Sequence, residues 1–550
     1  MRLLSLLAVS LCLGLPAAHA AAVKPIAAAA QTAGAERAIA ALLAEPALRI
    51  AGIAVDTAAL APAYAARRNE SLWTTAKGPT AAAQAALAAL RDAAADGLDP
   101  ADYPVGELER LARELTSPEG RARFDLALSQ VLATFGRHLH GGRVAPARIA
   151  EDIHYANRTP DVAALLRAAA ADPAAALAAL RPRHAAYARL RTALAAERAK
   201  IGTQEWPRVP GGDTLKLGMV DPRVVVLRQR LIATGEMADD APLNETYDEG
   251  VEAAVKAFQV AFGLEPDGAV GRRTLSMMNL TPQERVEKIV ATMERWRWLS
   301  DDLGDRHVMV NIPGYELQAV EKGRAALRMP VVVGSDERRT PLMSDAITHL
   351  VFNPTWTVPL SIAKKDILPK LIENPGYAIE QNLLIYDGWA ADAPTLNPYA
   401  IDWVKVGQGI TRYRLRQEPG PLNALGRVKF VFPNKDDIYL HDTPKRNLFD
   451  KARRALSSGC VRVGDPDALA GFILAANRNW TPERHAALLA DTATETVWVA
   501  KPVKVHLTYQ TAWVNDDGAV QYRADIYGRD RELIAALKEG RAGQRIALAN

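Results

Sequence analysis

The feature that most constrains the fold of this chain is a change in sequence texture near residue 305. Residues 21–200 are rich in alanine, the strongest intrinsic helix former, and their leucines recur three and four positions apart. From about residue 305, short β-branched runs are separated by glycine and proline, as is typical of strands and turns. The chain is also too long for one hydrophobic core. The sequence therefore predicts a multidomain α+β protein.

The alanine-rich part, residues 21–205, is predicted to be a helical scaffold domain. Helices are expected at 81–95, 106–115, 124–138, 162–180 and 184–198. His138, His140 and His154 could be interpreted as metal ligands, but their spacing fits no known metal motif. Packed or solvated histidines are the more ordinary interpretation, and no metal or other cofactor is expected.

A second helical unit is predicted at 213–281, after a joint rich in proline and glycine at 206–212. Its apolar positions fit short amphipathic helices, Asp267-Gly268 supplies a tight turn, and Gly271 supplies a helix entry. This pattern resembles the peptidoglycan-binding domain type 1, a three-helix module, over almost the whole segment. The resemblance implies binding to glycan strands, and a helical spacer that has lost its ligand is the alternative.

The β-rich part is predicted to form a mostly-β catalytic domain at 305–500, followed by a hairpin and a helix at 501–550. Strands are expected at 307–312, 315–320, 329–334, 346–352, 428–432 and 438–440. An irregular stretch at about 364–412 is predicted to be an inserted lid, where Trp389 and Trp403 are either lid contacts or core residues. A closing hairpin is expected between 497–508 and 520–526, around the turn Asn515-Asp516-Asp517-Gly518.

The N-terminus has the pattern of a cleaved signal peptide at residues 1–20. Arg2 precedes an apolar run that is too short to span a bilayer, and Ala18-His19-Ala20 fits the small-residue rule for cleavage. An uncleaved anchor is the alternative. No later stretch has roughly 18 uninterrupted apolar residues, so we expect a soluble, exported, periplasmic chain without a transmembrane segment.

Two further compositional features narrow the possible functions. The formal net charge of +4 is small for 550 residues, and no run of lysine and arginine stands out, so nucleic acid is not an expected partner. Of the two cysteines, Cys12 lies in the leader and Cys460 does not. Because an exported chain with one thiol cannot form an internal disulfide, Cys460 is either a buried inert thiol or a reactive one.

The residues around Cys460 indicate nucleophilic chemistry. His441 lies nineteen positions before it, at the end of a predicted hairpin, and Cys460 lies at a loop–strand junction. Strand ends of one sheet can bring an imidazole to a sulfur, and a neighbouring imidazolium stabilises a thiolate. Such an ion pair would attack a carbonyl carbon and then protonate a leaving amine. From spacing alone, a buried cysteine beside an unrelated histidine remains the alternative.

Two motifs carry a more specific resemblance. Tyr439-x-His441-Asp442-Thr443-Pro444, followed by Ser457-Ser458-Gly459-Cys460-Val461-Arg462, resembles the signature of the YkuD-type L,D-transpeptidase catalytic domain. A segment at 417–426 that contains Asn423 matches the same family. The order of leader, scaffold, binding module and catalytic domain with a lid is similar to large periplasmic YcbB-like members.

The resemblance implies a role for each matching residue. Cys460 would be the nucleophile and His441 its base. The N–H groups of Gly459 and Cys460, helped by the Tyr439 hydroxyl, would form an oxyanion hole. Arg462 would orient the loop or meet a substrate carboxylate. The remaining substrate-binding candidates are Ser458, which replaces a histidine found in many members, together with Trp356 and Asn423.

The implied activity is formation of 3→3 cross-links between diaminopimelate residues of peptidoglycan. Cys460 would attack a tetrapeptide stem, release D-Ala and pass the acyl group to a second stem. Carbapenems would be expected to acylate the same thiol, and cell-wall synthases are expected partners. Alternatives that keep the acyl-enzyme are hydrolysis, D-amino-acid exchange and protein anchoring. A silent wall-binding scaffold is the alternative of a different class.

Overall fold

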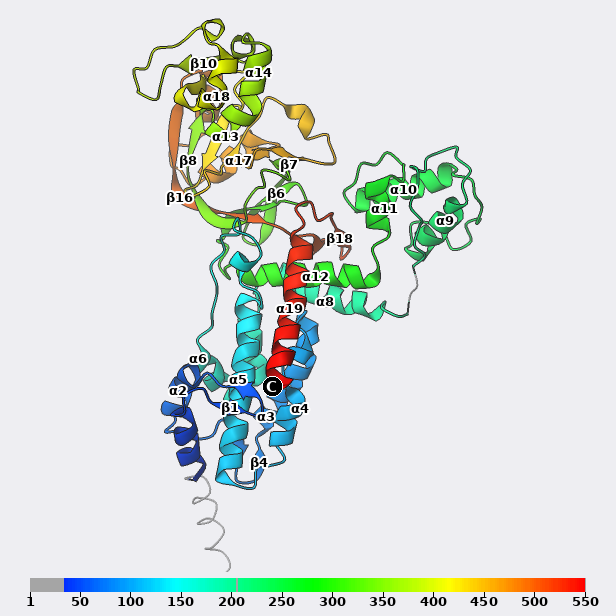
Figure 1. Ribbon diagram of the computed structural model, residues 1–550, viewed down its shortest axis with the longest axis vertical. Helices are drawn as coiled ribbons and strands as arrows, with labels where there is room; N and C mark the ends of the chain where they lie inside the picture. Colours follow the sequence, from blue (N-terminus) through cyan, green and yellow to red (C-terminus); the bar gives the residue numbers. More distant parts are fainter. Residues whose placement is uncertain (1–33, 204–205, 550) are drawn as a thin grey trace, which may run out of the picture.

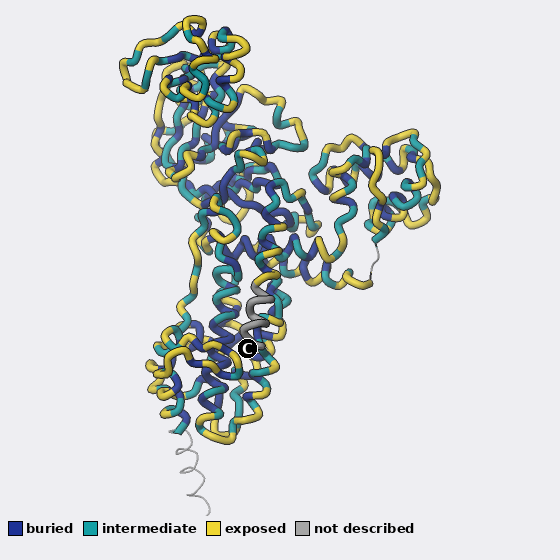
Figure 2. Tube along the Cα trace, in the orientation of Figure 1, coloured by how far each residue is buried: buried dark blue, intermediate teal, exposed yellow. Residues whose placement is uncertain are grey.

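The computed structural model describes residues 34–203 and 206–549, with side chains up to residue 539. The predicted signal peptide at 1–20 lies outside these residues. Figure 1 shows the scaffold at one end of an elongated molecule, the catalytic domain at the other, and the small helical module to one side. Buried residues are concentrated in the scaffold and in the catalytic sheet, as Figure 2 shows.

The scaffold is a helical bundle with two short hairpins. Its helices are α2 (Thr57–Ala65), α3 (Ala81–Arg91), α4 (Val105–Leu111), α5 (Pro118–Gly141), α6 (Val162–Ala171), α7 (Pro173–Leu180) and α8 (Ala185–Ala199). The hairpins pair β1 (Arg49–Ile50) with β2 (Ile53–Ala54), and β3 (Thr74–Thr75) with β4 (Gly78–Pro79). The helix predicted at 162–180 is two helices, because Asp172 caps α7 and Pro173, at its first position, has no N–H to continue α6.

The small module contains α9 (Arg223–Ala233), α10 (Glu249–Ala261) and α11 (Arg272–Met278). Gln259 of α10 holds the loop between α10 and α11: its side-chain amide donates to Asp267 Oδ1 at 2.7 Å and accepts from the Gly268 N–H at 2.9 Å. The module packs on the C-terminal hairpin, where Phe262 stacks on Tyr522. Arg523 also donates to the Ala261 carbonyl at 3.0 Å.

The catalytic domain is built on a nine-stranded mixed sheet with the order β14-β7-β15-β13-β12-β8-β16-β5-β6. Its strands are β5 (Arg306–Asn311), β6 (Glu316–Glu321), β7 (Arg324–Gly334), β8 (Met343–Phe352), β12 (Val428–Val431), β13 (Leu440–His441), β14 (Ala455–Ser457), β15 (Val461–Val463) and β16 (Glu495–Thr508). Because β6 also pairs with β7, the sheet curls back on itself. The helices that contribute to its core include α12 (Pro282–Trp298), α17 (Pro466–Leu474) and α18 (Pro482–Ala490).

The inserted lid is wider than the expected 364–412. It has its own sheet of β9 (Trp356–Thr357), β10 (Leu383–Tyr386) and β11 (Arg414–Gln417). Its helices are α13 (Leu360–Ile362), the π-helical turn η4 (Ala363–Ile367), α14 (Leu368–Glu373), α15 (Tyr377–Glu380) and α16 (Trp403–Val406). A separate apolar core runs from Val358 to Leu415. Trp403 lies in that core, whereas Trp389 is exposed at the cavity described below.

The prediction of the closing hairpin is wrong in its first strand, which is not 497–508. The turn at 515–518 joins β17 (Ala512–Val514) to β18 (Val520–Tyr522), and α19 (Arg529–Ala549) follows. Residues 497–508 belong instead to β16, which lies between β8 and β5 in the central sheet. An end of the catalytic domain at residue 500 would therefore cut through a core strand.

The scaffold also touches the catalytic domain directly. Ile153 forms a parallel bridge with Leu342, and Tyr155 Oη donates to the Leu507 carbonyl at 2.6 Å. His154 Nε2 lies 2.5 Å from Asp436 Oδ2, in the turn before β13. Among the helices that the structure describes, none combines the length and apolar character required of a membrane span.

Candidate active site

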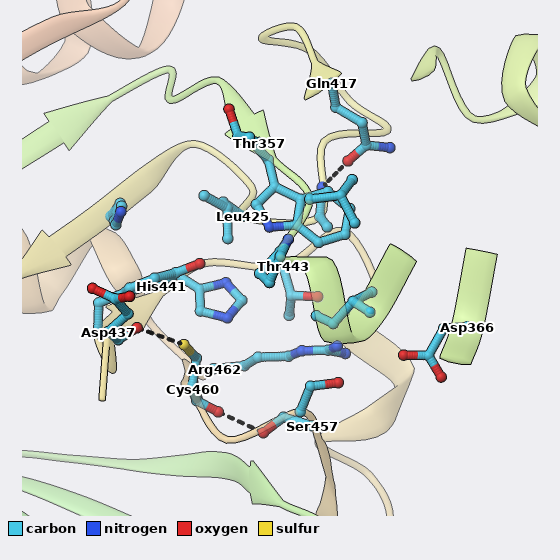
Figure 3. Close-up of a pocket in the computed structure, with 18 of the residues that line it drawn as sticks. Thr357, Asp366, Gln417, Leu425, Asp437, His441, Thr443, Ser457, Cys460 and Arg462 are labelled. Carbon is cyan, nitrogen blue, oxygen red and sulfur yellow. Dashed lines mark hydrogen bonds between the residues drawn. The ribbon is translucent and has the colours of Figure 1, made fainter. Parts of the chain in front are cut away.

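Adjacent strands place four of the predicted site residues on one wall of a cavity. In the parallel pair β13–β15, Leu440 lies opposite Val461 and His441 lies opposite Arg462. Because side chains alternate along a strand, Tyr439 and His441 share a face, as do Cys460 and Arg462. All four line the same cavity of about 1310 Å³ between the sheet and the lid. Figure 3 shows His441, Cys460 and Arg462 together in this cavity.

The loop that carries Cys460 is shaped by Ser457. The buried Ser457 Oγ donates to the Cys460 carbonyl at 2.5 Å and accepts from the Gly459 N–H at 3.2 Å. Gly459 has φ +119°, a conformation that other residues rarely adopt. The Cys460 N–H forms no hydrogen bond within the described residues. In this structure Cys460 therefore presents the free backbone donor, while the Gly459 N–H is already engaged.

His441 is buried and held in one tautomer. Its Nδ1 lies 2.5 Å from the Asp442 carbonyl, which can only accept, so Nδ1 carries the hydrogen and Nε2 keeps its lone pair. Burial lowers the pKa of His441 to about 3, assisted by the cations Arg462 and Lys429. The imidazole is therefore neutral at physiological pH and has the state required of a general base.

The resting thiol is neutral as well. Burial raises the pKa of Cys460 above its ordinary value, although hydrogen bonds from Tyr439 and the charges of Lys429 and Arg462 act in the opposite direction. Cys460 Sγ points to the Asp437 carbonyl at 3.8 Å, as Figure 3 shows. The pKa directions favour a neutral resting pair over the predicted thiolate–imidazolium pair, because His441 is buried and Cys460 is partly buried.

Lys429 is a site residue that the sequence analysis missed. It lies on β12 directly opposite His441, and its Nζ sits 4.0 Å from the centre of the Tyr439 ring. Burial lowers the pKa of Lys429, while the charges of Cys460 and Asp437 raise it. The available signal for its position was the predicted hairpin of 428–432 with 438–440, at whose exit His441 lies.

Tyr439 and Trp356 lie at the same end of the cavity. The pKa of Tyr439 is raised by burial first, and then by the charge of Cys460 and a hydrogen bond to it. A hydrogen bond from the Trp356 side chain acts in the opposite direction. These contacts place the Tyr439 hydroxyl beside the Cys460 sulfur.

Ser458 and Asn423 are placed differently from the other candidates. Ser458 lines the cavity and accepts a hydrogen bond from Arg338 Nη1 at 2.7 Å; Arg338 also forms a two-pronged ion pair with Asp366 of the lid. Asn423, in contrast, is buried and does not line the cavity. Its amide donates to the Pro354 and Glu418 carbonyls and accepts from the Leu425 N–H. Asn423 was expected to contact substrate, but in the structure its side chain holds neighbouring backbone segments together.

Two of the scaffold histidines considered as metal ligands contact other side chains in the structure. His138 is partly buried, lies 3.0 Å from the Tyr103 hydroxyl and has its pKa lowered to about 3 by burial. His154 contacts Asp436. Across 34–203 and 206–549, no group of three or more potential ligands converges on a common metal position.

Comparison with known proteins identifies three segments. Residues 58–194 match a family model described as "Scaffold domain", residues 220–278 one described as "Putative peptidoglycan binding domain", and residues 305–523 one described as "L,D-transpeptidase catalytic domain". The chain is 39% identical over 247 residues to a Haemophilus influenzae protein named "Putative L,D-transpeptidase". The match covers 45% of this chain and 49% of that protein, so the chain spans about half the length of this relative.

Two solved L,D-transpeptidases are also similar. The protein from Xylanimonas cellulosilytica is 17% identical, covering 54% of this chain and 99% of the solved chain, with a TM-score of 0.18. The one from Stackebrandtia nassauensis is 13% identical, covering 55% and 97%, with a TM-score of 0.19. Because these TM-scores are low, the assignment depends on the sequence matches. Residues 305–523 thus match a YkuD-type L,D-transpeptidase catalytic domain, and residues 220–278 match a peptidoglycan-binding domain.

Proposed function

We propose that this chain is a periplasmic L,D-transpeptidase that forms 3→3 cross-links in peptidoglycan through an acyl-enzyme on Cys460. The observation that carries the proposal is the placement of Cys460 and a neutral His441 on one wall of a cavity within the L,D-transpeptidase domain. Nucleophilic acyl transfer needs a thiol, a base and donors for an oxyanion, and each has a candidate here.

In the first half-reaction, Cys460 Sγ attacks the carbonyl that joins diaminopimelate to D-Ala in a tetrapeptide stem. His441 Nε2 accepts the thiol proton as the carbon–sulfur bond forms. The tetrahedral intermediate then collapses, and the imidazolium donates that proton to the leaving D-Ala amine. The Nδ1–H bond to the Asp442 carbonyl holds the ring during both transfers.

The negative charge on the intermediate needs donors that are already in position. The Cys460 N–H is one, and the Tyr439 hydroxyl beside the sulfur is the other. A single such donor contributes about 3 kcal/mol to transition-state stabilisation. The nearby Lys429 and Arg462 favour the charged form of Cys460, and so favour a developing thiolate.

In the second half-reaction, the side-chain amine of a second stem's diaminopimelate attacks the thioester. His441 Nε2 removes the amine proton, and the departing sulfur recovers a proton as the new amide forms. A carbapenem would acylate the same thiol. The binding module is proposed to hold glycan strands, and cell-wall synthases are proposed to supply stems.

The test is product analysis with disaccharide-tetrapeptide as both donor and acceptor. Wild-type protein should give a dimer whose tandem mass spectrum assigns a bond between two diaminopimelate residues, together with free D-Ala. Tripeptide without dimer would establish a hydrolase instead. Unchanged substrate would reject acyl transfer and favour a silent wall-binding scaffold.

A further inference from the structure

The charged residues around the cavity are unevenly balanced. Five of its lining side chains are cationic and three are acidic. Asp366 is paired with Arg338, and Asp436 with His154. Lys429 forms no ion pair within the described residues, but its Nζ lies over the Tyr439 ring and Asp437 raises its pKa. The other lining cations that form no ion pair within the described residues are Lys370, Lys445 and Arg462.

These three cations come from separate elements that meet at the cavity. Arg462 is on β15, Lys445 is in the loop after β13, and Lys370 is on α14 of the lid. None of them forms an ion pair within the described residues. Lys370 Nζ lies 3.3 Å from the hydroxyl of Tyr377, which is neutral. Arg462 Nε is buried without a hydrogen-bond partner.

Lys445 is repelled by the other two cations. Burial lowers the pKa of Lys445, and the charges of Arg462 and Lys370 lower it further. Figure 3 shows the Arg462 side chain crossing the cavity from the Cys460 loop toward the lid segment that carries Asp366. Cations that converge on a cavity without a counter-charge are expected to be stabilised by an anionic ligand.

We propose that Arg462, Lys445 and Lys370 form a subsite for a carboxylate of the donor stem peptide. The subsite lies beside Cys460, and it is completed only when the lid contributes Lys370. The ligand chemistry is a carboxylate on a peptide. Its source is either the terminal D-Ala or the side-chain end of diaminopimelate. This inference rests on the proposed function for the identity of the donor.

The experiment measures donor binding by calorimetry in full-length Cys460→Ala protein, so that no acylation interferes. Three probes are compared: disaccharide-tetrapeptide, the same molecule amidated at the terminal D-Ala, and the same molecule amidated at the diaminopimelate side chain. The double variant K370Q/K445Q is made in the same background. The matched control is K364Q/K365Q, which removes two lysines of the same lid segment that do not line the cavity.

Removing the two lysines should weaken tetrapeptide binding about fivefold to twentyfold, since partly exposed ion pairs are individually modest. In the Cys460→Ala protein, one of the amidated probes should bind more weakly than the unmodified tetrapeptide, by at least the same factor. That probe should bind the double variant as tightly as it binds the Cys460→Ala parent. That probe identifies the carboxylate. The control variant should bind like its parent.

The proposal is overturned if the tetrapeptide does not bind Cys460→Ala protein. It is also overturned if binding is unaffected by amidation and by K370Q/K445Q, or if the control variant loses as much affinity. The proposed function is judged separately by acylation of the wild-type thiol. If the wild-type thiol is acylated but K370Q/K445Q binds the tetrapeptide as tightly as its parent, the subsite is rejected and the proposed function stands.

Discussion

Replacing Ser457 with alanine should loosen the nucleophile loop, and the structure gives the magnitude. Ser457 Oγ satisfies two backbone groups, the Cys460 carbonyl and the Gly459 N–H, in a buried position. Each buried polar group left without a partner costs about 1–3 kcal/mol. Because the adjacent cavity gives water partial access to Cys460, we expect the free energy of unfolding to fall by about 2–4 kcal/mol.

The neighbouring serine is the matched control. Ser458 is exposed, and within the described residues its Oγ accepts a hydrogen bond from Arg338 alone. Arg338 keeps its ion pair with Asp366 when the hydroxyl is removed. Ser458→Ala should therefore change stability by less than about 0.5 kcal/mol. The two substituted serines are adjacent in the chain, yet the loss in free energy of unfolding should be several times larger for Ser457→Ala.

The assay is urea unfolding followed by hydrogen-exchange mass spectrometry on peptides from β12 to β15, which isolates the catalytic domain. Ser457→Ala should also slow acylation of Cys460 by about tenfold to hundredfold, because the Cys460 N–H loses its orientation. Equal destabilisation by Ser457→Ala and Ser458→Ala would refute the argument that Ser457 shapes this loop.

Three further predictions follow from the same geometry. Alkylation of Cys460 by the neutral reagent iodoacetamide should rise about tenfold per pH unit from pH 7 to 9, because burial raises the thiol pKa; a rate plateau beginning below pH 7 would instead indicate a resting thiolate–imidazolium pair. Gly459→Ala should cost about 1–3 kcal/mol through strain at φ +119°, measured by the same urea assay, whereas Gly471→Ala, in α17 with open space around it, should not destabilise the domain. As pH falls from 6.5 toward 3, unfolded chains bind a proton that the folded His441 excludes, so this residue should remove about 1.4 kcal/mol of stability per pH unit. His441→Gln should reduce that slope, and an unchanged slope in denaturant titrations at several pH values would contradict the buried neutral imidazole.

Local patterns predicted much of the fold. Alternating β-branched residues predicted the hairpin that ends at His441, and the structure has β12 paired with β13 there. As expected, His441 also lies next to the strand that follows Cys460. Alanine-rich segments whose leucines recur three and four positions apart located most of the scaffold helices that the structure describes. These features depend on neighbours in the sequence, so they can be derived from it.

The errors concern distant partners. Residues 497–508 form strands by propensity, but only the tertiary structure selects β8 and β5 as their neighbours over β18. The extent of the lid was predicted too small, because its core includes Val358 and Leu415, which lie outside 364–412. The local sequence around these two residues does not indicate that they pack in the lid. The charge states of His441 and Cys460 depend on burial by residues far apart in the chain, and spacing alone does not encode that burial. Lys429 is a different case, because the predicted hairpin already places it near His441 on the neighbouring strand.

The central claim, acyl transfer through Cys460, is tested most directly by intact-protein mass spectrometry. Wild-type and Cys460→Ala proteins are incubated with disaccharide-tetrapeptide, and the adduct is mapped by peptide sequencing. The account predicts a covalent adduct on Cys460 equal to the donor minus D-Ala, formed as free D-Ala appears, with neither product from the variant. D-Ala release by Cys460→Ala at the wild-type rate, or an adduct on another residue, would contradict it.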